Sequence, residues 1–335
     1  MTAVVLRKRG AVVGLPRFQP RTPCGTPQSP KDVPLTDKVK SIAEVVTAIP
    51  DGSHIALGGF AIARNSMVAV HELIRQGKRD LTVSQAVMGM DTDLLVGAGA
   101  VSRLIAGGGS LDRFGRVECV NRARAGSTLV ALDMSSLSVT FAYLAGALGL
   151  SCIPIKSLMA SEIERRLQAG PGAEMLRDFT CPFTGEQYLL LRALTPEVAF
   201  VHVQRADRQG NAQIDGPRWE NEEAAKAARQ VVVVTEELVP TEIIQQQPER
   251  TLIPAHRVGA VVHQPFGAHP SAVFRCYDYD ARHLELYVSH ARAADRIGVY
   301  IDRFVRDTQD FWQYLELAAG FKHLESLRAD RVLGY

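Results

Sequence analysis

The stretch that decides the fold is residues 51–65, DGSHIALGGFAIARN. Asp51-Gly52 is a turn dipeptide, and residues 55–57 form an apolar run without polar alternation, which predicts a strand buried on both faces. Gly58-Gly59 follow where such a strand reaches the carboxyl edge of a parallel sheet. Glycines at this edge let backbone N–H groups come close to a ligand. The stretch therefore predicts a strand that leads into a glycine loop.

A helix is expected after this loop, over residues 67–75, with Asn65 or Ser66 as its N-cap and Gly77 past its end. Strand, glycine loop and capped helix in this order predict a ligand-binding βα unit. Glycine pairs between a strand and a helix also serve tight packing without any ligand, and the local sequence is compatible with both interpretations.

Composition narrows the class of protein. The chain has 335 residues, long enough for a full core, and its 38 Lys+Arg nearly balance its 36 Asp+Glu. This balance gives no sign of a nucleic acid or an anionic membrane as partner. The five cysteines are scattered and lack CxxC spacing, so neither a disulfide framework nor a metal site is indicated, and a cytoplasmic location is expected. Residues 137–155 are weakly polar but interrupted by glycine and proline, which predicts a buried helix followed by a short strand.

The N-terminal residues 1–34 differ from the rest of the chain. Prolines recur every few residues among arginines, and no acidic residue precedes Asp32. Such a segment cannot bury enough apolar surface to offset its ordering entropy, so it is expected to be a disordered Pro/Arg-rich arm. Residues 35–335 are expected to form the folded domain.

Repeated strand, glycine and helix units along residues 36–335 predict an α/β fold with an open, mostly parallel sheet and flanking helices. The predicted strands, after 55–57, are residues 81–84, 104–106, 152–155, 198–203, 231–235 and 260–262. The predicted helices are residues 36–49, 67–75, 137–148, 221–229 and a last one that includes Phe311, Trp312 and Leu315.

A second candidate site is Gly107-Gly108-Gly109-Ser110, directly after a predicted strand. Successive glycines expose backbone N–H groups, and the Ser110 hydroxyl adds a donor where an acyl carboxylate or carbonyl could bind. A flexible surface loop is the competing interpretation.

Two further loops carry distinctive polar residues. The run 204–212, QRADRQGNA, follows a predicted strand, and its Asp before Gly-Asn is also ordinary turn chemistry.

The run 265–271, PFGAHPS, precedes Tyr277-Asp278-Tyr279-Asp280, and Pro270 restricts His269 to an extended conformation. A catalytic role for His269 is one interpretation, but a loop histidine fixed by hydrogen bonds is the favoured one. No histidine pair has metal-ligand spacing.

These motifs together resemble the alpha-type half of family I coenzyme A transferases, above all the glutaconate branch. The resemblance rests on DG-x2-apolar-GGF at residues 51–60, on QRADRQGN at 204–211, and on GAHPS followed by YDYD at 267–280. It covers residues 36–335. The sequence departs from the family signature at Ser66, where the family has proline. It also has Arg64 in place of the signature's glycine, as is often the case in the glutaconate branch.

The resemblance implies a CoA-transferase/NagB-RpiA-like fold and a CoA-transferase activity that moves coenzyme A between an acyl-CoA, including a dicarboxylic one, and a free carboxylate. Coenzyme A would enter as part of the substrate, with no permanently bound cofactor.

The family's nucleophile is a glutamate in a Glu-Asn-Gly or Glu-Ser-Gly motif of the beta half. This chain has only Glu220-Asn221-Glu222, without the glycine. No catalytic residue is therefore expected on this chain, and a beta subunit is expected as partner in a hetero-oligomer. The residues expected to bind substrate are Gly58, Gly59, Phe60, Gly107, Gly108, Gly109, Ser110, Ser135, Gln204, Asn211 and His269.

Two alternatives remain open. Similar subunit pairs cleave a steroid ring of an acyl-CoA by hydrolysis or decarboxylate a glutaconyl-type thioester. The hydrolases are expected to carry an acid at the start of the helix, where this chain has Ser135, and this difference favours the transferase. Asp133 is close in sequence, so the hydrolase stays open as an alternative. A sugar-phosphate-sensing module would need a cluster of Lys or Arg in the glycine loops, and Arg64 and Arg113 do not form one.

Overall fold

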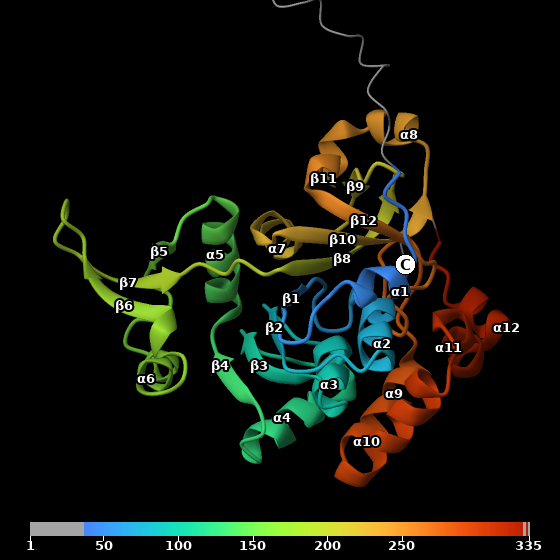
Figure 1. Cartoon of the computed structure of the whole chain (residues 1–335), viewed down its shortest axis with the longest axis horizontal. Coiled ribbons are helices and arrows are strands. Elements are labelled where there is room, and N and C mark those ends of the chain that lie inside the picture. The colour runs from blue at the N-terminus through green and yellow to red at the C-terminus, as the bar shows by residue number, and fades with distance from the viewer. Residues whose placement is uncertain (1–36, 331–332, 334–335) are drawn as a thin grey trace, which may run out of the picture. The chain divides into compact units, whose positions relative to one another are not determined.

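A nine-stranded sheet forms the centre of the computed structural model, which describes residues 37–330 and 333 (Figure 1). Its parallel part runs in the order β4-β3-β2-β1-β8-β10-β12. β9 pairs antiparallel with the end of β8, and β11 pairs antiparallel with β9. The strands are β1 (His54–Leu57), β2 (Leu81–Gln85), β3 (Val101–Ala106), β4 (Val130–Asp133), β8 (Val198–Ala206), β9 (Ala212–Gln213), β10 (Gln230–Leu238), β11 (Thr251–Ile253) and β12 (Val258–His263). The predicted arm, residues 1–34, lies outside the described residues.

β1 is the strand at which the chain changes direction across the sheet. After β1 the chain builds β2, β3 and β4 on one side, and it later returns to place β8, β10 and β12 on the other. Ile55 pairs with Val83 of β2 and with Val198 of β8. In open α/β sheets a ligand binds outside the carboxyl ends of the strands at such a switch point. The loop after β1 therefore occupies the position that this topology reserves for a ligand.

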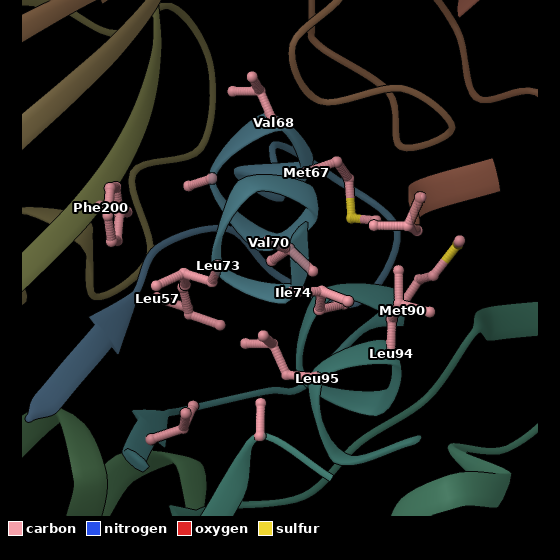
Figure 2. Packing of buried hydrophobic residues seen from close by; sticks show 14 of the residues in the cluster. Leu57, Met67, Val68, Val70, Leu73, Ile74, Met90, Leu94, Leu95 and Phe200 are labelled. Atoms are coloured by element: carbon pink, nitrogen blue, oxygen red, sulfur yellow. The ribbon is translucent and has the colours of Figure 1, made fainter. Parts of the chain in front are cut away.

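Both faces of β1 are buried, as its apolar run predicts. Ile55 and Leu57 belong to a core that includes the helices α1, α2 and α3, whereas Ala56 belongs to a second core that includes α5 and α7. Figure 2 shows Leu57 beside Leu73 of α2 and Leu95 of α3 in the first of these cores. Helices that contribute to these cores include α1 (Ile42–Thr47), α2 (Met67–Arg75), α3 (Met90–Gly97), α4 (Glu118–Ala125), α5 (Ser136–Ala147) and α7 (Asn221–Ala227).

A smaller antiparallel sheet of β5, β7 and β6 continues the second core beyond α5. These strands are β5 (Cys152–Ile155), β6 (Leu176–Thr180) and β7 (Gln187–Arg192), and α6 (Glu162–Ala169) precedes β6. The remaining helices are α8 (Thr241–Gln245), α9 (Ala281–Ala291), α10 (Ala294–Ile301), α11 (Phe311–Ala318) and α12 (Gly320–Ser326).

The open, mostly parallel sheet predicted from the sequence is confirmed, and the strand at each predicted position is present. Three details differ. The first helix begins at Ile42 rather than at residue 36, and α12 follows the helix that was expected to be the last. Ser66 lies at the N-cap position of α2, but its side chain makes no capping hydrogen bond. Residues 137–155 form α5 and β5, as predicted. Among the described residues, no helix is long and apolar enough to cross a membrane.

The core around α2 contains a histidine without polar partners. His71 is fully buried, and neither ring nitrogen has a hydrogen-bond partner among the described residues. Its ring packs edge-on against Phe311 at 5.1 Å and Tyr314 at 4.3 Å, measured between ring centroids. Burial holds the pKa of His71 well below 6.5, and the charges of Arg75, His283 and His269 lower it further. His71 therefore stays neutral in the folded chain.

A leucine at position 71 should make the protein less sensitive to acid. Below pH 6.5 the unfolded chain binds a proton at this histidine and the folded chain does not, so the stability is present above pH 6.5 and lost as the pH falls. Between pH 7.5 and 5.5 the wild type should lose about 1.4 kcal/mol more unfolding free energy than His71→Leu. Urea unfolding at the two pH values measures this difference. His256→Gln, which replaces an exposed ring, is the control and should follow the wild type; equal losses in all three proteins would contradict the assignment.

Candidate active site

Three loops meet at the carboxyl edge of the sheet, and backbone hydrogen bonds join them. They are residues 58–65 after β1, residues 86–89 after β2 and residues 107–110 after β3. The joining bonds run from N–H to carbonyl oxygen in the pairs Ala61 to Val87 (3.3 Å), Gly107 to Ala86 (3.1 Å), Met88 to Gly108 (2.9 Å) and Ser110 to Met88 (3.1 Å). The glycine loops that follow these strands thus lie together on one sheet edge. These three segments are called the loop edge below.

Gly58 and Gly59 are buried, and they let the backbone pack closely against other parts of the chain. The Gly58 N–H donates to the Phe200 carbonyl at 2.9 Å, and the Gly59 N–H donates to the Asn221 side-chain oxygen at 3.1 Å. A Cβ on Gly58 would lie 2.4 Å from the same Asn221 oxygen. Both N–H groups are thus already paired inside the chain, unlike the open ligand donors that the sequence suggested. The tight-packing interpretation holds for this pair.

Phe60 follows the two glycines and is half-buried. Its ring stacks on Trp219, with ring centroids 5.3 Å apart and planes 14° from parallel. The stack connects the loop after β1 to the segment that precedes α7. Phe60 therefore contributes an aromatic wall to the loop edge rather than a polar contact.

The loop after β3 does offer open donors. Gly107 is enclosed, since a Cβ there would lie 2.3 Å from the Ser136 nitrogen. Gly108 and Gly109 are exposed, and their N–H groups have no partner among the described residues. The Ser110 oxygen accepts a hydrogen bond from the Asp112 N–H at 2.9 Å, which leaves its O–H free to donate. Donors for a carbonyl or carboxylate therefore lie at residues 108–110.

Ser135 lies next to this loop at the start of α5. Its oxygen caps the helix by accepting from the Ser138 N–H at 3.1 Å, and it also lies 2.7 Å from the Ser138 hydroxyl oxygen. Asp133, the nearby acid, pairs instead with Arg124 at 2.6 Å. The start of α5 thus presents hydroxyls and no carboxylate to the loop edge.

Three predicted site residues are engaged in contacts away from the loop edge. The Gln204 amide donates to the carbonyls of Asp215 and Phe274, both at 3.0 Å. Asn211 lies in a turn, where its amide donates to the Asp207 carboxylate at 2.8 Å and its oxygen accepts from the Ala255 N–H at 3.0 Å. These contacts hold loops together, and the structure does not bring either side chain to residues 108–110.

His269 is the third of these residues. It is buried, with Nδ1 2.9 Å from the Tyr314 hydroxyl and Nε2 3.1 Å from the Asp280 carboxylate. Burial lowers the pKa of His269, and the bond to Asp280 opposes this shift. The ring is thus held in an aromatic and histidine cluster between the C-terminal helices, as the structural interpretation of this loop histidine suggested.

Glu220 contacts the loop edge, and sequence reasoning did not select it. Its carboxylate accepts from the Ala86 N–H at 3.2 Å, and only 2% of the residue is exposed. Burial raises the pKa of Glu220 to about 7, because the charged form is poorly solvated there. The available signal was the Glu220-Asn221 pair ahead of an alanine-rich helix. That pair lacks the glycine of the family's nucleophile motif, and no other local pattern marks it.

The described residues contain no group of three or more His, Cys, Asp or Glu side chains that could hold a metal ion. What the loop edge offers chemically is a set of backbone and hydroxyl donors, an aromatic wall and one carboxyl group of raised pKa. Such a set can bind and polarise an acyl group.

Comparison with known proteins shows the family and the fold of this chain. Residues 39–264 match the family model for coenzyme A transferase. The chain is 37% identical to an uncharacterised protein of Archaeoglobus fulgidus over 88% of this chain, and it spans 65% of that protein's length. It is 30% identical to a glutaconate CoA-transferase subunit of Acidaminococcus fermentans, over 89% of this chain and 97% of that subunit. It is 27% identical to a cholesterol ring-cleaving hydrolase IpdA subunit of Rhodococcus jostii, over 83% and 95% of the two chains.

The solved structure of glutaconate coenzyme A-transferase from Acidaminococcus fermentans superposes with a TM-score of 0.83 at 29% identity, over 89% of this chain and 98% of that one. The fold is that of an α/β protein with an open, mostly parallel sheet and flanking helices. Within that class, the chain belongs to the coenzyme A transferase family.

An alanine at Gly59 should be more harmful than one at Gly52. Both glycines have positive φ, +95° and +78°, so either alanine adds backbone strain. A Cβ at Gly59 would also lie 2.7 Å from the Arg64 carbonyl oxygen, whereas one at Gly52 meets nothing within 4 Å. We expect Gly59→Ala to lower the unfolding free energy by about 2 kcal/mol more than Gly52→Ala, as measured by urea unfolding. Equal losses would show that the loop after β1 relaxes freely.

Proposed function

We propose that this chain is the alpha subunit of a heteromeric CoA-transferase that moves coenzyme A between an acyl-CoA and a free carboxylate. The observation that carries the proposal is the open donor set at residues 108–110, which lies at the loop edge without a nucleophile and base beside it. Family membership and the 30% identity to a subunit of a glutaconate CoA-transferase support the reaction class. Coenzyme A enters with the substrate, and no permanently bound cofactor takes part.

Ser110 has a binding role in this proposal. A serine becomes a nucleophile only when a base takes its proton. The partners of Ser110 among the described residues are the Met88 carbonyl and the Asp112 N–H, and neither is a base. His269 is already engaged with Tyr314 and Asp280. The covalent step is therefore assigned to a glutamate of the beta subunit, as the resemblance to family I enzymes implies.

The loop edge would assist that glutamate by stabilising charge on the acyl oxygen. When the glutamate attacks the thioester, negative charge develops on the carbonyl oxygen, and preorganised N–H and O–H donors stabilise this charge. The N–H groups of Gly108 and Gly109 and the hydroxyl of Ser110 are suited to this task. Glu220 acts behind them: its bond to the Ala86 N–H positions the loop after β2, which in turn holds Gly108 through Met88.

Ring-cleaving hydrolysis is the second candidate, because the relative of Rhodococcus jostii carries that activity in its name. That reaction is expected to need an acid at the start of α5. Ser135 caps the helix at this position and Asp133 is paired with Arg124, so neither supplies a free carboxylate there. This observation favours transfer over hydrolysis.

Reconstitution tests the proposal. The purified chain alone should show no CoA transfer from an acyl-CoA to a free carboxylate, and addition of the separately encoded beta subunit should produce it. The control is the beta subunit by itself, which should also be inactive. Sustained transfer by the isolated chain, or release of free acid and coenzyme A in place of transfer by the complex, would refute the proposal.

A further inference from the structure

A fully buried carboxyl group lies beneath the loop edge, at the start of α3. The Oδ1 atom of Asp91 accepts hydrogen bonds from the N–H groups of Gly89 at 3.1 Å and of Thr92 at 2.8 Å. Its Oδ2 atom accepts from the side-chain amide of Gln85 at 2.8 Å. Burying a polar group is unfavourable unless it is hydrogen-bonded, so Asp91 and these three donors stabilise one another.

Gln85 connects Asp91 to the loop after β1. It is the last residue of β2 and is fully buried. A carboxylate only accepts hydrogen bonds, so the NH2 end of the Gln85 amide faces Asp91, and the amide oxygen accepts from the Thr92 hydroxyl at 2.6 Å. The same NH2 group also donates to the Gly58 carbonyl at 3.3 Å. Asp91 therefore determines the orientation of an amide that bonds to the loop after β1.

The loop after β2, residues 86–89, is held at each end by a buried carboxyl group. Glu220 accepts from the N–H of its first residue, Ala86, and Asp91 accepts from the N–H of its last residue, Gly89. These two acids come from different helical segments, and each contacts a different end of the loop. The loop after β2 is therefore fixed from both sides.

This loop in turn holds the open donors. The Met88 N–H donates to the Gly108 carbonyl at 2.9 Å, and the Met88 carbonyl accepts from the Ser110 N–H at 3.1 Å. The N–H groups at residues 108–110 are thus placed by a loop whose end Asp91 holds. Asp91 contacts two of the three loops through one bond or one side chain, and it reaches the third through Met88.

A cap for α3 is the simpler role of Asp91. An acid in the first turn of a helix satisfies free N–H groups and interacts favourably with the helix dipole, and Gly89 at the N-cap position makes no side-chain capping bond. Only Oδ1 serves this role, because Oδ2 faces Gln85. The helix is also anchored by apolar residues such as Leu94 and Leu95, which lie in the first core (Figure 2). The bond at Oδ2 therefore serves the loops rather than the helix.

We propose that Asp91 is a positioning residue for CoA transfer: through Gly89 and Gln85 it holds the loops after β1 and β2, and through them the donors at residues 108–110. Such donors stabilise charge on a substrate oxygen only if they are fixed in place before the charge develops. The effect on turnover rests on the proposed function, whereas the positioning of the loops does not.

Asp91→Asn separates the two roles, because it keeps the shape of the side chain and an oxygen for the cap. Its NH2 group would face the NH2 group of Gln85, and two donors cannot bond to each other. The Gln85 amide must turn over to accept from the new donor, and this takes its NH2 group away from the Gly58 carbonyl. The loop after β1 then loses its bond while α3 keeps its cap.

Asp93→Asn is the matched control. Asp93 is also fully buried and lies one position beyond Thr92 on α3. Its carboxylate accepts from the Val120 N–H of α4 at 2.9 Å and from the Tyr287 hydroxyl of α9 at 2.7 Å, so it faces away from the three loops. The control therefore changes a buried carboxylate of the same helix without touching the loop edge.

Hydrogen–deuterium exchange of the full chain, without a partner, tests the positioning directly. In Asp91→Asn the N–H groups of Met88 and Ser110 should exchange roughly tenfold faster than in the wild type, because the loops open more often. Asp93→Asn should leave these two rates unchanged and should raise the rate of Val120 instead. Unchanged rates at Met88 and Ser110 in Asp91→Asn would overturn the proposal. Equal acceleration of both groups in the two variants would also overturn it, since that shows only a general loss of stability.

Turnover of the complex with the beta subunit tests the consequence for catalysis. Asp91→Asn should lower kcat roughly ten- to a hundredfold and change KM less than about twofold, since misplaced donors affect the transition state more than substrate binding. Asp93→Asn should keep the kcat and KM of the wild type. Thr92→Val removes only the hydroxyl that bonds to Gln85, and it should lower kcat roughly threefold.

The two measurements separate the positioning role from the proposed function. An unchanged kcat in Asp91→Asn, or an equal loss of kcat in Asp93→Asn, would overturn the role in catalysis. If the wild-type complex transfers no coenzyme A, the proposed function fails, and the exchange rates decide whether Asp91 holds the loops. If circular dichroism shows that Asp91→Asn is unfolded, Thr92→Val takes its place, and unchanged exchange at Met88 and Ser110 in that variant would overturn the proposal.

Discussion

The rest of the structure depends on a close approach of backbones at the end of β1. Gly58 and Gly59 bring the chain against the Phe200 carbonyl and the Asn221 side chain, where a Cβ has no room. This contact joins β1 to β8 and to the start of α7, and both of these segments are distant from β1 in sequence. Because the two halves of the sheet meet at β1, the position of every loop on the carboxyl edge follows from this junction.

The loop edge contains two kinds of glycine, enclosed and exposed. Gly58, Gly59 and Gly107 are enclosed and bind other parts of the chain, and so they hold the loops in register. Gly108 and Gly109 then project from that frame with open N–H groups beside Ser110. Donors fixed in this way need little reorganisation when charge develops on a substrate oxygen. The loop after β3 thus contains both an enclosed glycine, Gly107, and the exposed glycines Gly108 and Gly109.

The fold was largely predictable because local signals agreed with it. Buried apolar runs such as residues 55–57 mark parallel strands, and Pro, Gly and polar residues mark their ends. The site was only partly predictable. Ser110 followed from a local pattern, but Arg64 and Glu220 owe their environments to contacts with Pro217 and Ala86, more than a hundred residues away. Burial and long-range contacts cannot be read from neighbouring residues. His269 shows that a distinctive motif need not mark a site. Its side chain is buried and contacts Tyr314 and Asp280.

The central claim is that this chain builds half of an active site and leaves the covalent step to its partner. The most direct test is to add borohydride to the complex during turnover with an acyl-CoA and then to measure the mass of each chain. Borohydride reduces a glutamyl thioester to an alcohol, which marks the residue that carried coenzyme A. The account predicts that the beta subunit is modified and that the mass of this chain is unchanged. A modification on this chain, at Ser110 or at Glu220, would contradict it.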